Sequence, residues 1–362
     1  MKPLCFVFGT RPEIIKFSPL IYECQKRKVP FFVIHTGQHY DTLLDQVFFE
    51  ELSLPQPEYS LNMGDLSLPY PEKLGAMITG IERVLRERTP TAVVVQGDTT
   101  SALAGALAAK RACFPVAHVE AGLRSRDYAM TEEWNRIMID KVADWYFAPT
   151  KEWAAQLVAE SVDEARIYTV GNSVVDAVKA HSVLSETRAA KLLNQYGLTD
   201  KQYILATVHR AENADSRERL EGILKGITQV AEEHHLPVLL PLHPRTKHKY
   251  EEFGLTVSSS IQIIEPLGYL EFLPLEAHAR LIITDSGGLQ EEASILRVPC
   301  VTVRDSTERP ETVEAAMNML AGAEASTITQ AARTMLSRDI QWIDLYGDGK
   351  TGERIVSILT KT

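Results

Sequence analysis

The amino-acid sequence predicts an α/β fold with two Rossmann-like domains that face each other across a cleft. With 362 residues, the chain is longer than one hydrophobic core usually supports, so two domains are expected. Short apolar runs alternate with longer amphipathic segments, and the runs are continuously apolar, as in parallel sheets covered by helices on both faces. The series of strand-like runs is interrupted near residues 170–178, which divides it in two.

The order of these runs gives the expected domain boundaries. The predicted strands of the first half are residues 4–9, 31–36, 92–97, 116–121 and 145–150. Those of the second half are residues 203–209, 237–243, 261–266, 280–286 and 299–306. Predicted helices lie between them, such as 102–113 and 133–142. We expect an N-terminal domain over 1–170, a C-terminal domain over 171–345, and a C-terminal helix within 346–362 that packs back on the N-terminal domain.

The composition excludes several classes of protein. A net charge of -10 argues against a nucleic-acid-binding surface. The four cysteines show no C-x-x-C spacing and are typical of thiols in a reducing compartment. The N-terminus reaches a charged motif too early for a signal peptide, and no apolar run approaches the roughly 20 residues of a membrane span. We therefore expect a soluble, cytoplasmic protein without a nucleic-acid or membrane partner.

Polar motifs follow the predicted strands at the point where each strand ends. Ligands of parallel sheets bind beyond the carboxyl ends of the strands, so these motifs predict the functional site. They are Gly9–Arg11, Gly37–His39, Gly97–Thr99, Glu120–Arg124, His209–Asn213, His243–Arg245, Asp285–Gly288 and Arg304–Arg309.

The stretch "TDSGGLQEEA" at 284–293 predicts an anion site. Ser286, Gly287 and Gly288 lie between a predicted strand and a helix, where free backbone N–H groups and the helix dipole favour a phosphate. Glu291 and Glu292 stand in the first turns of the same helix and would repel that charge. The ligand must therefore offer more than a phosphate.

Several carboxylates of the first half have both a structural and a functional interpretation. Glu13 and Lys16 in "GTRPEIIK" fit a surface ion pair on a capped helix, while Arg11 beside them fits an anion contact. Asp98 in "VQGDTTSALAGALAA" is most simply a helix N-cap, and the small residues after it predict close helix packing. Glu120 ends an apolar strand, so it must be paired or catalytic.

Two further residues are similarly ambiguous. Thr131 resembles an N-cap, and Glu132 after it fits the acidic first turn of a helix as well as a reactive carboxylate. His209 is either a satisfied structural histidine or a phosphate ligand, and His243 repeats its pairing with arginine. No G-x-G-x-x-G follows the first predicted strand, and the sequence has no zinc-type histidine spacing, P-loop or G-x-S-x-G motif. Basic groups for a diphosphate, combined with several carboxylates, indicate a nucleotide-sugar enzyme without a metal.

The motifs together resemble those of the non-hydrolysing UDP-N-acetylglucosamine 2-epimerase family. In chain order they are "GTRPEIIK", "TGQH", "VQGDTTSALAGALAA", "HVEAGLRS", "EEWNR", "FAPT", "VGNSVVDA", "TVHRAEN", "LHPRT", "TDSGGLQEEA" and "RDSTERPE". The resemblance implies the two-domain GT-B fold, a homodimer, and reversible conversion of UDP-N-acetylglucosamine to UDP-N-acetylmannosamine without NAD or metal. The UDP would bind mainly to the C-terminal domain, with the sugar and the catalytic groups on the N-terminal domain.

The resemblance also implies roles for individual residues. It places His209, Ser286, Gly287, Gly288, Glu292, Arg11, Phe272 and Arg309 at the UDP. Within this set Glu292 would accept hydrogen bonds from ribose hydroxyls and Phe272 would lie beside the uracil, whereas Glu291 would be solvated. The catalytic and sugar-facing residues would be Lys16, Asp98, Glu120, Glu132 and Arg136, with His209 also a catalytic candidate.

The sequence departs from the family's pattern in places, which leaves alternatives open. Thr131 replaces a common proline, Ala316 and Met317 replace a usual Gly-Thr pair, and Tyr40 and Asp41 argue against a second, allosteric nucleotide-sugar site. The alternatives are a 2-epimerase of a 2,3-diacetamido uronate, with Arg126 as its extra cation, a hydrolysing epimerase, and a GT-B glycosyltransferase. A catalytically silent UDP-sugar-binding regulator is disfavoured because all the carboxylate positions are filled.

Overall fold

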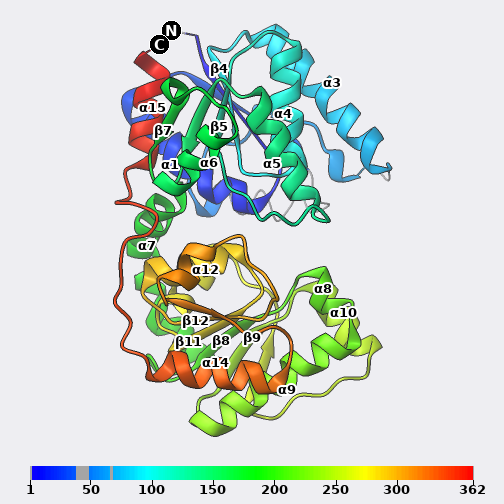
Figure 1. The fold of residues 1–362 in the computed structure, drawn as a ribbon, viewed down its shortest axis with the longest axis vertical. Coiled ribbons are helices and arrows are strands. Elements are labelled where there is room, and N and C mark those ends of the chain that lie inside the picture. The colour runs from blue at the N-terminus through cyan, green and yellow to red at the C-terminus, as the bar shows by residue number, and fades with distance from the viewer. Residues whose placement is uncertain (1, 38–48, 66–67, 362) are drawn as a thin grey trace. The chain divides into compact units, whose positions relative to one another are not determined.

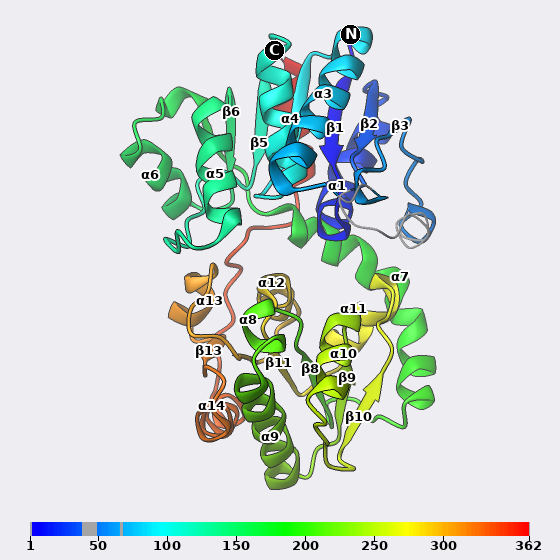
Figure 2. The ribbon, with the colours of Figure 1, turned by 90° about the vertical axis from the view of Figure 1, so that its right-hand side faces the viewer.

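The computed structural model describes residues 2–37, 49–65 and 68–361. The chain folds as two compact α/β units, shown in Figure 1 and, turned by 90°, in Figure 2. Unit 1 comprises Met1–Ala177 and Tyr346–Thr362, and unit 2 comprises Val178–Leu345. The last segment of the chain thus returns to the unit in which the chain begins.

Unit 1 is built on a seven-stranded parallel sheet with the order β3-β2-β1-β4-β5-β6-β7. Its strands are β1 (Leu4–Phe8), β2 (Phe31–His35), β3 (Tyr59–Ser60), β4 (Ala92–Gln96), β5 (Val116–Val119), β6 (Trp145–Ala148) and β7 (Ile167–Thr169). Its helices are α1 (Arg11–Arg27), α3 (Tyr70–Arg88), α4 (Thr100–Arg111), α5 (Thr131–Val142), α6 (Lys151–Ala159) and α15 (Thr351–Lys361), with short 3-10 turns η1 (Met63–Asp65) and η2 (Glu164–Arg166).

The central strands of unit 1 are buried on both faces, as their continuous apolar sequence predicts. Along β1, Phe6 and Phe8 pack against Phe17 of α1, while Cys5 and Val7 contribute to the core on the side of α3 and α4. The small-residue helix α4 lies very close to the sheet, because a Cβ added at Gly105 would come within 2.9 Å of a Val95 methyl group. The expected close packing of this helix is confirmed.

Unit 2 is built on a six-stranded parallel sheet with the order β10-β9-β8-β11-β12-β13. Its strands are β8 (Ile204–Thr207), β9 (Val238–Pro241), β10 (Ile261–Ile264), β11 (Leu281–Thr284), β12 (Cys300–Thr302) and β13 (Asn318–Leu320). Its helices are α8 (Ala211–Ala214), α9 (Arg217–His234), α10 (Pro244–Glu252), α11 (Tyr269–Ala277), α12 (Gly287–Leu296), α13 (Pro310–Glu314) and α14 (Ala325–Ser337), and α7 (Ser173–Gln195) begins in unit 1 and continues into unit 2.

Alternate residues of the unit 2 strands pack into two separate hydrophobic cores, one on each face of the sheet. Ile204 and Ala206 pack in a cluster with α9 and α14, whereas Leu205 packs on the other face with α7, α11 and α12. Both faces of the sheet are therefore covered by helices, as Figure 1 shows.

Both strand orders reverse direction at the first strand of the sheet. The chain builds outward from β1 through β2 to β3 and then returns to add β4 on the other side of β1; unit 2 does the same with β8 and β11. The carboxyl ends of the two strands at such a switch point are where parallel sheets bind ligands. The loops after β1 and β4, and those after β8 and β11, carry most of the residues singled out in the sequence.

The C-terminal helix α15 packs on α1 within unit 1. A Cβ added at Gly352 would lie 2.9 Å from the backbone of Pro19, and the Arg27 guanidinium donates a 2.6 Å hydrogen bond to the Ser357 hydroxyl. In the described part of the chain, no helix is long and apolar enough to cross a membrane.

Candidate active site

The loop after β4 places Asp98 at the switch point of unit 1. Its carboxylate forms an ion pair with Arg136 of α5, whose side chain is 5% exposed, and its backbone carbonyl accepts a 2.8 Å hydrogen bond from Asn135. Thr99, not Asp98, caps α4, because its hydroxyl oxygen accepts from the Ala102 N–H at 3.0 Å. The interpretation of Asp98 as a helix cap is therefore wrong, because its carboxylate pairs with Arg136 instead of capping α4.

Glu120 directly follows β5 and is paired. The Lys16 Nζ and Asn172 Nδ2 lie 2.5 and 2.8 Å from the same carboxylate oxygen, Oε1. The Glu120 backbone has φ +65°, in the left-handed region that a non-glycine residue adopts at a cost of about 1 kcal/mol. A 6% exposed carboxylate held by two donors on a strained backbone is typical of a functional site.

The start of α1 is organised by Glu13 rather than by a surface ion pair. Glu13 is 3% exposed and accepts hydrogen bonds from the N–H groups of Gly9 and Thr10, at 3.0 and 2.9 Å, and from the hydroxyl groups of Thr10 and Thr99. Burial raises the pKa of Glu13 to about 7, against these hydrogen bonds, which lower it. The expected Glu13–Lys16 surface pair is wrong, since Lys16 pairs with Glu120. Glu13 thus joins the loop after β1 to the loop after β4, and Arg11 is the first residue of α1.

A buried network that the sequence did not predict supports these loops. Asp140 of α5 accepts from His118 Nδ1 at 2.6 Å, from the Gly122 N–H at 3.2 Å and from Arg124 at 2.8 Å. The other ring nitrogen of His118 lies 2.8 Å from the carbonyl oxygen of Gly97, the residue before Asp98. The polar residue at the centre of an otherwise apolar strand, His118, was the available indication.

The two adjacent glutamates of α5 have opposite environments. Glu133 is 1% exposed and accepts hydrogen bonds from the Ser125 and Arg126 N–H groups at 2.8 and 3.1 Å, which fixes that loop. Glu132 is exposed. The N-cap position is occupied by Met130, whose side chain makes no cap hydrogen bond, so the expected Thr131 cap is wrong.

Asp285 organises the switch point of unit 2. It is fully buried after β11 and accepts hydrogen bonds from the backbone N–H groups of His209 and Arg210, from His209 Nδ1 at 2.8 Å and from Asn213 Nδ2 at 3.1 Å. Burial works against its ionisation, but the bond and charge of His209 outweigh burial and lower the pKa of Asp285. His209 is thereby held with its Nδ1 occupied, and its side chain is 39% exposed.

The start of α12 has the open geometry expected of an anion site. The Ser286 hydroxyl caps the helix by accepting from the Leu289 N–H at 3.5 Å. A Cβ added at Gly287 or Gly288 would meet no described atom closer than 3.7 Å, so the fold itself does not require glycine there. Arg210 lies beside Gly287 and pairs with Glu308 at 3.5 Å.

Glu291 and Glu292 of α12 are both buried, at 0% and 8% exposure. Glu291 Oε1 lies 2.6 Å from the Nε of Arg309, so the expectation of a solvated Glu291 is wrong. Arg309 also donates to the Glu308 carbonyl at 3.1 Å. Phe272 of α11 is half-buried and packs against the core cluster that also receives Leu289 of α12.

The predicted residues are thus divided between the two units. In unit 1 they are Arg11, Lys16, Asp98, Glu120 and Arg136, with Glu132 exposed at the start of α5. In unit 2 they are His209, Phe272, Ser286, Gly287, Gly288, Glu292 and Arg309. The positions used against an allosteric site, Tyr40 and Asp41, and the motif residue His39 lie outside the described residues.

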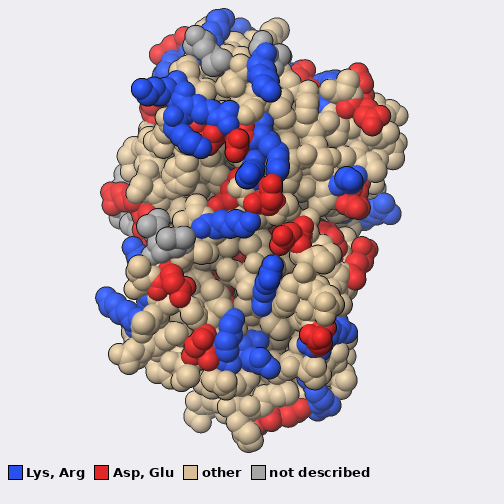
Figure 3. All heavy atoms as spheres, turned by 90° about the vertical axis from the view of Figure 1, so that its left-hand side faces the viewer, with Lys and Arg blue, Asp and Glu red and all other residues tan. Residues whose placement is uncertain are grey.

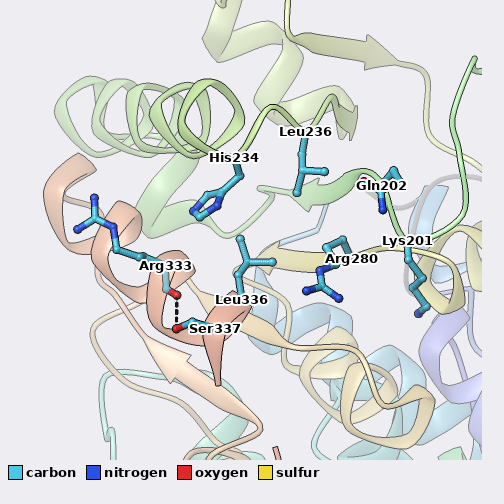
Figure 4. Close-up of a pocket in the computed structure, with 8 residues that line it drawn as sticks. All are labelled: Lys201, Gln202, His234, Leu236, Arg280, Arg333, Leu336 and Ser337. Atoms are coloured by element: carbon cyan, nitrogen blue, oxygen red, sulfur yellow. Dashed lines mark hydrogen bonds between the residues drawn. The ribbon is translucent and has the colours of Figure 1, made fainter. Parts of the chain in front are cut away.

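An open pocket of about 540 Å³ in unit 2 is separate from this group (Figure 4). It is lined by residues that precede β8, β9 and β11, such as Gln202, Leu236 and Arg280. It therefore lies at the amino ends of the strands, opposite the candidate residues.

Across the described residues, no cluster of three or more His, Cys, Asp or Glu side chains is arranged to hold a metal ion. Basic and acidic side chains lie beside one another over the face in Figure 3.

Comparison with known proteins places this chain in a family. The family model described as UDP-N-acetylglucosamine 2-epimerase matches residues 22–360. The chain is 47% identical over 362 residues to a UDP-N-acetylglucosamine 2-epimerase of Methanocaldococcus jannaschii, covering 99% of this chain and 98% of that protein. A crystal structure of the M. jannaschii enzyme with UDP-GlcNAc and UDP matches with a TM-score of 0.92 and 47% identity, over 100% of both chains.

A relative with a different substrate name is less similar. The UDP-2,3-diacetamido-2,3-dideoxy-D-glucuronate 2-epimerase of Pseudomonas aeruginosa is 39% identical over 360 residues, covering 98% of each chain. The structural neighbours have the two-domain GT-B-like fold that the motifs predicted. The chain belongs to the UDP-N-acetylglucosamine 2-epimerase family.

Proposed function

We propose that this protein interconverts UDP-N-acetylglucosamine and UDP-N-acetylmannosamine by elimination of UDP to 2-acetamidoglucal and its re-addition. The observation that carries the proposal is that each unit has a different kind of site at the carboxyl ends of its strands. Unit 2 has an open helix start with a buried glutamate one turn further in, and unit 1 has carboxylates held by basic side chains. We assign UDP binding to unit 2 and the sugar chemistry to unit 1.

The start of α12 fits a diphosphate. The backbone N–H groups of Gly287 and Gly288 lie at the start of α12, where the helix dipole favours negative charge. The two residues have no side chain, so a phosphate group can approach the backbone closely. His209, whose Nδ1 is occupied by Asp285, has Nε2 for a diphosphate oxygen. Arg309 and Arg11 add positive charge, Glu292 accepts bonds from the ribose hydroxyls, and Phe272 lies beside the uracil.

The reaction requires the unit 1 carboxylates because the C2–H of the sugar has no adjacent carbonyl to acidify it. Cleavage of the C1–O bond sends its electron pair to UDP and leaves positive charge at C1. Loss of the C2 proton to a carboxylate then gives 2-acetamidoglucal. Protonation on the opposite face and return of UDP to C1 give the epimer. Carboxylates stabilise the cation and carry the proton, and basic groups stabilise the departing diphosphate.

Asp98 and Glu120 are the proposed proton-transfer and cation-stabilising pair. Arg136 fixes Asp98, while Lys16 and Asn172 fix Glu120, so both carboxylates are oriented before substrate binds. Glu132 is the third candidate. Its side chain is exposed, whereas the neighbouring Glu133 is held by hydrogen bonds from the backbone N–H groups of Ser125 and Arg126.

The alternative functions gain no comparable support. The more similar relative carries the UDP-N-acetylglucosamine name, while the diacetamido uronate epimerase is 39% identical. No observation favours a hydrolysing epimerase or a glycosyltransferase over the epimerase.

We further propose that the protein is a cytoplasmic homodimer. Trp134 and Met138, four residues apart on one side of α5, are 49% and 40% exposed, and the ring of Tyr128, 61% exposed, lies 5.6 Å from that of Trp134. A second copy of the chain would cover these apolar side chains. Light scattering on the purified protein tests the proposal: twice the monomer mass supports it, and the monomer mass contradicts it.

The reaction itself is tested by approach to equilibrium from both sides. Separate incubations with UDP-N-acetylglucosamine and UDP-N-acetylmannosamine, without added NAD or metal, are followed by chromatography. We expect both to converge on one mixture of the two nucleotide sugars. Release of free N-acetylmannosamine would instead indicate a hydrolase, and no conversion of either compound would contradict the proposal.

A further inference from the structure

A second buried acid lies behind Glu292. Glu276, on α11, is 0% exposed, and α11 packs against α12, which carries Glu292. The ring of Tyr269, also on α11 and 6% exposed, belongs to the same group. Apart from Glu292, neither the Glu276 carboxyl group nor the Tyr269 hydroxyl has a hydrogen-bond partner in the described chain.

The surroundings of Glu276 contain no compensating cation among the described residues. The titratable groups that interact with it are Glu292, Tyr269, Tyr203 and Cys300, all of which become negative when they ionise. Burial, followed by the charge of Glu292 and a hydrogen bond to it, raises the pKa of Glu276 well above its ordinary value. A carboxyl group in such a place remains neutral and becomes a hydrogen-bond donor.

We propose that Glu276 is a positioning residue for Glu292, donating a carboxyl O–H bond that fixes the Glu292 carboxylate for the ribose of the nucleotide. The Tyr269 hydroxyl group donates a second hydrogen bond to Glu292 in this proposal. Burial and the nearby glutamate charges raise its pKa well above the ordinary value, so the hydroxyl also stays a donor. A carboxylate accepts about four hydrogen bonds, so Glu292 can accept bonds from Glu276 and Tyr269 and still serve as an acceptor for the ribose.

This arrangement resolves how a carboxylate can be buried close to a phosphate site. The two donors behind Glu292 stabilise its negative charge through charge-assisted bonds, without adding a cation that would compete for the diphosphate. The inference rests on the proposed function for the identity of the ligand as a uridine nucleotide. It goes beyond that function by assigning ribose recognition to a three-residue unit.

Binding measurements on full-length variants test the proposal. Isothermal titration of UDP and of its 2′,3′-dideoxy analogue is performed on the wild type, Glu276→Gln and Glu276→Leu. The Gln variant keeps a donor, so UDP affinity should stay within about threefold of wild type. The Leu variant lacks the donor, so UDP affinity should fall by about tenfold or more, with the dideoxy analogue unaffected. Tyr269→Phe should show the same selective loss and serves if the Leu variant does not fold.

The pH profile separates positioning from simple packing. UDP affinity of the wild type should fall as alkaline pH ionises Glu276 and sets two carboxylates against each other, whereas Glu276→Gln should keep its affinity. Identical pH profiles, or equal losses for UDP and the dideoxy analogue, would overturn the inference alone. Failure of the wild type to bind UDP would overturn the inference and the proposed function together. UDP binding with the predicted selectivity but no epimerisation would overturn only the proposed reaction.

Discussion

Glu291 and Arg309 form a buried ion pair that ties α12 to the start of α13. The Nε of Arg309 lies 2.6 Å from Glu291 Oε1, and the two side chains are 9% and 0% exposed. The pair holds Arg309 at the mouth of the proposed diphosphate site. In the proposed site, Glu291 would act on the nucleotide through Arg309, whereas Glu292 would contact the ribose directly.

Breaking this pair should destabilise unit 2. Removing one partner of a buried ion pair costs about 3–5 kcal/mol, because the other charge is left buried and unpaired. We expect Glu291→Gln to lower the free energy of unfolding by an amount in that range, measured by urea denaturation. The matched control is Glu265→Gln, which removes an exposed pair with Lys247 and should cost less than about 1 kcal/mol. Equal effects of the two substitutions would contradict a buried, structural pair.

Asp98 and Thr99 should separate function from stability at adjacent positions. Asp98→Asn removes the charge proposed for catalysis but leaves the α4 cap intact, so we expect a loss of about 10²–10⁴-fold in kcat. The melting temperature should change little, because Arg136 keeps its ion pair with the buried Glu133. Thr99→Ala removes the cap and a bond to Glu13, and should cost about 1–2 kcal/mol of stability. UDP affinity should be unchanged in Asp98→Asn. Unfolding of that variant would show that Asp98 is structural.

Gly288 should be replaceable without loss of stability but not without loss of binding. A Cβ at this position would lie 3.8 Å from the nearest described atom, the Ser286 hydroxyl oxygen, so Gly288→Ala should fold normally. The added methyl group would enter the space proposed for the diphosphate, and UDP affinity should fall by about tenfold, measured by calorimetry. The control is Gly222→Ala, whose Cβ would lie 2.4 Å from the Ala323 carbonyl oxygen and should destabilise the protein. Unchanged UDP affinity in Gly288→Ala would move the anion site elsewhere.

Glu308 should make stability depend on acid pH. Burial opposes its ionisation, but the charges of Arg304, Arg210 and Arg309 outweigh burial and lower the pKa of Glu308 to about 2 from an ordinary value of 4.5. Because the pKa of Glu308 is lower in the folded protein, its ionised carboxylate contributes about 3 kcal/mol to the free energy of unfolding. This contribution is present above about pH 4.5 and is lost as the pH falls toward 2. The free energy of unfolding should therefore fall less steeply in Glu308→Gln than in the wild type over this range. Equal slopes in urea titrations would contradict the assignment.

The sequence predicts the strands that carry the site because these are continuously apolar and buried. Each of the ten predicted runs contains an observed strand. Because the strands of each sheet are parallel, the polar residues after β1 and β4 lie at one edge of their sheet, and those after β8 and β11 lie at one edge of theirs. The strands not predicted are β3, β7 and β13, each two or three residues long at a sheet edge. They are too short to show a continuous apolar run, whereas the edge strand β10 (Ile261–Ile264) has four residues and was predicted.

Side-chain pairing was less predictable, because it depends on contacts between distant residues. Lys16 pairs with Glu120, 104 residues away, rather than with Glu13 on its own helix. Whether Glu291 is solvated or buried depends on how α12 is rotated against Arg309, which helical spacing alone does not determine. Asp285 and His118 have many partners because buried polar groups require them, and those partners come from separate loops.

The central claim is that the proton at C2 of the sugar is removed and replaced, and one measurement tests it most directly. The protein is incubated with UDP-N-acetylglucosamine in D2O, without NAD or metal, and C2 is followed by NMR. We predict that deuterium enters C2 of both UDP-N-acetylglucosamine and UDP-N-acetylmannosamine. Formation of the epimer with the original proton retained at C2, or no exchange at all, would contradict it.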